Sequence, residues 1–165
     1  MATEKLDTQV RQEQIAQATL ELVAAGGLKK LSVAAVARRV GLVPSALYRH
    51  FKGKDEVLDA TLGLIQDKLR DNVRAVSEET DDALEQLHGL LMRHVRMIRE
   101  NRGIPQIIFS QDFYTGHPDR RSRVYRGIRS YLAEVARIVR DGQEAGRIGR
   151  EVGRASCRER VFAVV

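Results

Sequence analysis

The stretch Gly41–Leu58, GLVPSALYRHFKGKDEVL, combines a helix-breaking glycine, a proline, two aromatic residues, a histidine and several cations. Pro44 suits the first turn of a helix, where its missing N–H is harmless, and the residues after it predict a short helix over 44–51. Leu47 and Phe51 are four residues apart, so we expect both to pack inward. The other side chains of this helix then face outward.

Helical periodicity continues on both sides of this stretch. Residues 9–25 carry one apolar face and end at a pair of glycines, while Ser32 stands as an N-cap before VAAVARRV, a second short helix that Gly41 ends. A longer helix begins near Lys54 and carries a continuous apolar stripe. Two short helices joined by a tight turn and braced by longer ones are typical of a helix-turn-helix, whose second helix enters the DNA major groove.

The outward residues of the second short helix match the chemistry of duplex DNA. The Tyr48 hydroxyl and the His50 ring can donate to phosphate oxygens, and Arg49 can pair with phosphate or with guanine edges. Lys54, beside a helix N-terminus, adds another positive locus. Taken singly, Tyr48 could be a half-buried packing ring and His50 an ordinary surface residue; the combination favours the DNA interpretation.

Residues 9–69 resemble the TetR family of bacterial transcriptional regulators, from IAQATLELVAAGGLKKLSV through VARRVGLVPSALYRHFKGKDEVL. The resemblance implies a DNA-binding domain over 9–69, with its helix-turn-helix motif at about 32–51, linked to a ligand-sensing and dimerising body. The implied DNA contacts are Ser32, Val33, Leu42, Val43, Pro44, Ser45, Tyr48, Arg49, His50 and Lys54. The family often has Ser or Thr where Val43 stands, and a valine can neither cap the helix through its side chain nor donate to phosphate.

Beyond this domain the sequence predicts more helices. The acidic run SEETDD at 77–82 marks a junction, followed by apolar stripes that predict helices from about residue 84 to 98, over 105–114 and over 119–143. The expected fold is therefore all-α, a three-helix head with an incomplete helical bundle over 70–150. Residues 151–165 are expected to be an irregular tail, foreign to the native coding sequence.

A ligand site is harder to place. Apolar and aromatic residues of the bundle could line an effector cavity or could equally be core; the candidates for ligand contact are Met92, Phe109, Phe113 and Tyr125. The resemblance names no effector.

Charge and hydropathy indicate which partners and which location to expect for the protein. The net charge is +6, and residues 1–54 hold nine Lys or Arg against four Asp or Glu, which suits an anionic partner but also an ordinary solvated basic face. No apolar run is long enough for a membrane span, and the charged start argues against export, so we expect a cytoplasmic protein.

Catalytic and metal sites find no support in the sequence. His88 and His94 are six residues apart, on opposing sides of one helix, and Cys157 is the single cysteine, with no base near it in sequence. We therefore expect no enzyme, no metal and no cofactor.

The sequence predicts a ligand-responsive transcriptional regulator, a repressor that binds a palindromic operator as a dimer. Residues 150–165 lack the two pairing helices that the resemblance implies, which argues against a homodimer of this chain. The alternative is a helical ligand-binding or adaptor bundle, derived from such a regulator, that does not bind DNA.

Overall fold

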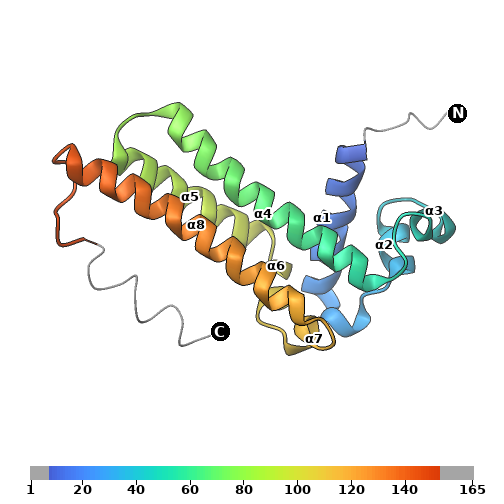
Figure 1. The fold of residues 1–165 in the computed structure, drawn as a ribbon. Coiled ribbons are helices and arrows are strands. Elements are labelled where there is room, and N and C mark those ends of the chain that lie inside the picture. Colours follow the sequence, from blue (N-terminus) through green and yellow to red (C-terminus); the bar gives the residue numbers. More distant parts are fainter. Residues whose placement is uncertain (1–7, 153–165) are drawn as a thin grey trace, which may run out of the picture. The chain divides into compact units, whose positions relative to one another are not determined.

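The computed structural model describes residues 8–152, and this part of the chain is helical and contains no strand. The helices are α1 (Thr8–Gly26), the 3₁₀-helix η1 (Leu28–Lys30), α2 (Val33–Arg39), α3 (Pro44–Tyr48), α4 (Lys54–Glu79), α5 (Ala83–Glu100), α6 (Gly103–Ile108), α7 (Gln111–Tyr114) and α8 (Pro118–Glu144) (Figure 1). The predicted all-α class is confirmed. None of these helices is long and apolar enough to cross a membrane.

The chain forms two compact units. Within the described residues, the head unit contains 8–68 together with 96–125, and the body unit contains 69–95 together with 126–152. The helices α4, α5 and α8 each contribute residues to both units. The functional division expected at residue 69 falls within α4 and stays a prediction.

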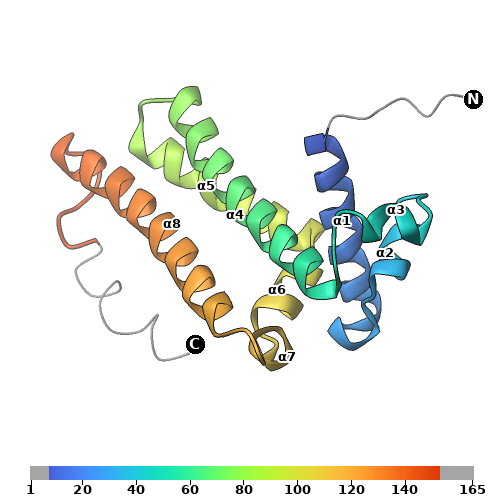
Figure 2. The same cartoon turned by 45° about the vertical axis from the view of Figure 1, so that its right-hand side comes forward.

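The head unit is built around α1. Figures 1 and 2 show α2 beside this helix and α3 next to α2, and Val36 of α2 and Leu47 of α3 are fully buried. The start of α6 also packs on α1, because a Cβ added to Gly103 would lie 2.2 Å from the carbonyl oxygen of Leu20. Only glycine allows that approach, so Gly103 fixes where α6 meets α1.

The body unit has its own apolar core. Its buried members come from α4, α5, α8 and the segment after α8: Val73, Val76, Ala83, Leu90, Ile138 and Ile148. After α8 the chain turns back at Gly146, whose φ is +69°, and the N–H of Arg147 reaches the carbonyl of Gly142 at 2.8 Å. Arg147 then donates to Asp82 at 2.7 Å, so this turn is fastened to the start of α5.

Three details differ from the sequence prediction. The helix expected over 105–114 is wrong, because the chain breaks at Phe109 and Ser110 into α6 and α7. An unbroken helix would place Ile107 and Phe113 well apart around its axis, and the break lets both become buried. The helix expected to reach Phe51 ends at Tyr48, and Phe51 is only partly buried. The short η1 was not expected.

Most of the predicted tail lies outside the described residues. Of residues 151–165 only the first two lie among the described residues, and Cys157 lies outside them.

Candidate nucleic-acid interface

The turn between α2 and α3 is a glycine-dependent helix end. Gly41 has a φ of +71°, its N–H donates to the carbonyl of Arg38 at 3.2 Å, and the next N–H, of Leu42, donates to Ala37 at 2.8 Å. This pair of bonds is the Schellman arrangement, which stops a helix and redirects the chain. The turn therefore separates α2 from α3 as a helix-turn-helix requires.

The capping of α2 agrees with the sequence. The Ser32 hydroxyl accepts a hydrogen bond from the N–H of Ala35 at 3.1 Å, so Ser32 is the N-cap. Its side chain remains exposed at the surface. The hydroxyl is thus available beside the N-terminus of α2.

Helix α3 begins without a side-chain cap. Pro44 occupies its first turn, and Val43 precedes it in an extended conformation with no hydrogen bond from its side chain, as the sequence indicated. One turn later Leu47 is fully buried and anchors α3 to the head core. This anchor turns Tyr48, Arg49 and His50 outward, and all three are exposed.

The candidate contacts divide by exposure. The exposed ones are Ser32, Val43, Ser45, Tyr48, Arg49, His50 and Lys54, while Leu42 and Pro44 are partly buried. Tyr48 is 52% exposed, which agrees with a DNA contact and equally with the half-buried packing ring. The Val33 side chain is only 2% exposed, so a DNA contact from Val33 would have to come from its backbone, and this contact stays a prediction.

The junction between α3 and α4 contributes further cations to the candidate interface. It is held by a hydrogen bond from the backbone to a side chain. The N–H of Lys52 donates to the Glu56 carboxylate at 2.8 Å, which bends the chain into α4 at Lys54. Sequence reasoning missed Lys52, an exposed cation between His50 and Lys54. Lys52 lies within the stretch Gly41–Leu58, between two predicted contacts, and this position could have identified it.

The start of α4 is also tied to α8, which no sequence pattern indicated. Asp55 and Asp59 accept hydrogen bonds from Arg120, whose side chain is 3% exposed. Burial alone would lower the pKa of Arg120, but hydrogen bonds and charge from Asp59 and Asp55 outweigh it and raise this pKa. Arg120 therefore stays charged inside the head unit.

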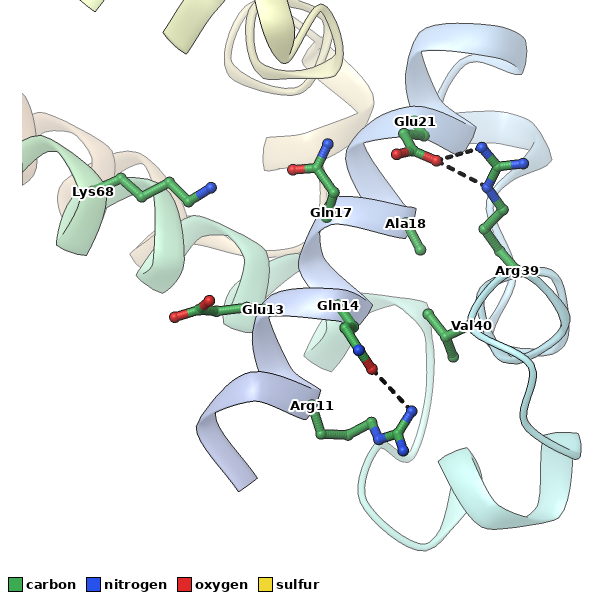
Figure 3. A pocket seen from close by; sticks show the side chains of 9 residues that line it. All are labelled: Arg11, Glu13, Gln14, Gln17, Ala18, Glu21, Arg39, Val40 and Lys68. Atoms are coloured by element: carbon green, nitrogen blue, oxygen red, sulfur yellow. Dashed lines mark hydrogen bonds and ion pairs between the residues drawn. The ribbon is translucent and has the colours of Figure 1, made fainter. Parts of the chain in front are cut away.

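A hollow of about 710 Å³ lies along α1 (Figure 3). Its lining residues are Arg11, Glu13, Gln14, Gln17, Ala18, Glu21, Arg39, Val40 and Lys68. Two interactions cross its rim: Arg11 donates to Gln14 at 3.0 Å, and the Nε of Arg39 donates to Glu21 at 2.9 Å. With charges of both signs and an open surface, this hollow lacks the apolar walls typical of effector pockets.

The four candidate ligand contacts differ in exposure and belong to different units. Phe113 is fully buried and stacks edge-on against Tyr114, whereas Phe109 is 73% exposed and borders a second hollow of about 390 Å³ beside η1. Tyr125 is exposed in the head unit, and Met92 is exposed in the body unit. Neither hollow is lined by Met92, Phe113 or Tyr125.

His94 of α5 combines an aromatic contact with an unpaired ring nitrogen. Its ring stacks on Tyr131 with centroids 5.6 Å apart, and its Nδ1 is buried without a hydrogen-bond partner. Burial raises the pKa of Tyr131. Across residues 8–152 no group of three metal-binding side chains forms, so His94 has no partners for a metal site there.

Comparison with known proteins agrees with this geometry. Residues 15–61 match the family model described as bacterial regulatory proteins, tetR family. The nucleoid occlusion factor SlmA of Pectobacterium carotovorum is 27% identical over 152 residues, covering 87% of this chain and 75% of SlmA.

Solved structures give the same fold. A TetR/AcrR-family transcriptional regulator from Thermobifida fusca is 26% identical with a TM-score of 0.60, over 86% of this chain and 74% of that one. FadR of Bacillus subtilis, solved in complex with stearoyl-CoA, is 20% identical with a TM-score of 0.64, over 85% and 75% of the two chains. The exposed α3 and the glycine turn before it lie within residues 15–61, which match the model of the TetR family of bacterial regulatory proteins, and the chain shares the fold of a TetR/AcrR-family transcriptional regulator.

Proposed function

We propose that this chain is a ligand-responsive transcriptional repressor that docks α3 in the major groove of a palindromic operator, with two copies bound per operator. One observation carries the proposal: α3 is a separate helix, anchored by buried Leu47, and Tyr48 at its end and Arg49 and His50 just after it are exposed. A helix held from beneath with a polar outer face is what major-groove recognition requires. The protein is a regulator and not an enzyme, and we place it in the cytoplasm.

The proposed contacts have distinct roles. Tyr48, His50 and Lys54 bind phosphate oxygens and fix the register on the duplex, while Arg49 reads a guanine edge or adds a phosphate contact. Ser32 and Ser45 offer hydroxyls to the backbone. Val43, exposed and apolar, suits a thymine methyl group, a role that needs no donor.

The test is a DNA titration by fluorescence anisotropy at two salt concentrations. The duplex is first selected from a random library with the parent protein. Lys54→Ala should weaken binding to every sequence and reduce the slope of log K against log salt by about one, because one phosphate contact is lost. Tyr48→Ala should weaken binding as well.

Lys68→Ala is the matched control, because it removes the same charge from the same helix, within the hollow along α1. It should leave affinity and salt slope close to those of the parent. If Lys54→Ala and Tyr48→Ala both bind like the parent, the contact assignment is wrong. A parent that binds no duplex at low salt would favour the alternative of a non-DNA-binding bundle.

The effector is proposed to be an apolar small molecule. Met92, Phe109 and Tyr125 remain candidate contacts, and Phe113 could reach a ligand only after leaving the core. A thermal-shift screen that includes stearoyl-CoA tests this proposal. Failure of every apolar and aromatic compound to raise the melting temperature would contradict it.

A second candidate function follows from the SlmA match, which extends past the DNA-binding domain over 87% of the chain. In that case the protein would act in nucleoid occlusion. A fluorescent fusion that covers the nucleoid, together with blocked cell division on overproduction, would favour this role over operator-specific repression.

A further inference from the structure

The buried guanidinium of Arg120 donates five hydrogen bonds within the head unit. Its Nε donates to Asp59 Oδ1 at 3.0 Å, and its Nη1 donates to Asp55 Oδ1 and to the Phe113 carbonyl, both at 3.0 Å. Its Nη2 donates to the Asp55 carbonyl at 2.9 Å and to Asp59 Oδ2 at 3.3 Å. All three nitrogens are therefore engaged.

Two neighbours of Arg120 strengthen the same junction. Arg123 Nη1 donates to Asp59 Oδ1 at 3.0 Å, and His117 Nε2 lies 3.2 Å from Asp55 Oδ1. The ring of Phe113 lies 5.0 Å from the Arg120 guanidinium carbon. The first turns of α8 are thus fastened to the first turns of α4 by several charged hydrogen bonds.

Only arginine can make this set of bonds. The planar guanidinium has five N–H donors in a fixed fork, while a lysine ammonium has three donors at a single point. A buried charge that loses its partners is strongly unfavourable. Substitutions at Arg120 should therefore loosen α8 from α4.

The fastened end of α4 is the end that faces the proposed DNA interface. Asp55 follows Lys54 directly, and Glu56 in the same turn accepts the N–H of Lys52. We propose that Arg120 is a positioning residue for DNA binding: it fixes the first turn of α4, and through it Lys54 and the end of α3. Any shift of the α8 start would then reach the interface through Asp55. This inference rests on the proposed function.

The positional claim is tested without DNA, by hydrogen–deuterium exchange of the folded full chain. In Arg120→Gln, peptides covering residues 44–54 should exchange at least threefold faster than in the parent. Arg137→Gln is the matched control, because Arg137 also lies on α8 and pairs with two carboxylates, Glu134 and Asp141, but at an exposed site. If exchange over 44–54 is unchanged in Arg120→Gln, the inference is wrong.

A second variant with a milder effect keeps the test valid if the first variant does not fold. If circular dichroism shows that Arg120→Gln does not fold, Asp59→Asn removes one carboxylate of the junction and keeps the side-chain shape. The same acceleration of exchange over 44–54 is expected. Its absence in folded Asp59→Asn overturns the inference.

DNA binding tests the functional link. Measured well below the melting temperature, Arg120→Gln should weaken affinity at least tenfold and reduce the salt slope as Lys54→Ala does, and Arg120→Lys should not restore either. Lys54→Ala should cost less in the Arg120→Gln background than in the parent, because the two changes act on one contact. Additive effects with an unchanged salt slope would mean that Arg120 acts only on stability.

The two proposals fail in different ways. A parent that does not bind duplex DNA contradicts the proposed function, and the exchange experiment then still decides whether Arg120 positions α4. A parent that binds while folded Arg120→Gln binds equally well contradicts the role of Arg120 alone.

Discussion

At the scale of single residues, two glycines predict opposite responses to alanine. Gly41 has a φ of +71° and open space where a methyl group would lie, so Gly41→Ala should cost about 1–2 kcal/mol from backbone strain alone. Gly63, inside α4, also has open space, and Gly63→Ala should add about 1 kcal/mol through helix propensity. Urea unfolding measures both, and a loss of stability in Gly63→Ala would contradict the open environment.

Single residues also differ in how well the sequence predicted their roles. The Schellman glycine, the Ser32 cap and the buried Leu47 were all expected, because local spacing determines them. Arg120 was not, because its partners Asp55 and Asp59 are 65 and 61 residues away in the chain. The Val33 side chain is buried, which the resemblance could not indicate because it gave a position and not the direction of the side chain.

At the scale of elements, the start of α5 predicts a pH dependence. Asp82 accepts the N–H groups of Leu84 at 2.9 Å and Glu85 at 3.2 Å, and Arg147 binds it from the turn after α8. The N–H of Glu85, then Arg147, lowers the pKa of Asp82 below 3.8. A lowered folded pKa means that the carboxylate stabilises the fold above 3.8, and that this stabilisation is lost as the pH falls through the folded pKa.

The variant that isolates this charge is Asp82→Asn, which keeps a capping oxygen. Its melting temperature should lie below that of the parent at neutral pH, and the gap should close as the pH falls below 3.8. Asp81→Asn, at the adjacent exposed carboxylate, is the control. A gap that stays constant across the acid range would show that the Asp82 charge does not contribute.

Hydrophobic periodicity predicted the long helices of the fold but not every helix boundary. The stripes of α1, α4, α5 and α8 were found because each is long and has one apolar face. The break between α6 and α7 was missed because no glycine or proline between Ile107 and Phe113 marks it in the sequence. The burial that decides this boundary depends on contacts distant in sequence.

At the scale of the whole molecule, the proposed operator geometry predicts the form of the selected DNA. Each chain has one α3, so a palindromic operator requires two copies, with their recognition helices about one DNA turn (~34–36 Å) apart. Sequences selected from a random library should therefore contain inverted half-sites about 10 base pairs apart, centre to centre. Inserting about five base pairs rotates one half-site to the opposite face, and binding should then fall to that of a single half-site. Recovery of single half-sites only, bound one protein per duplex in analytical ultracentrifugation, would contradict paired binding and leave each α3 to read DNA alone.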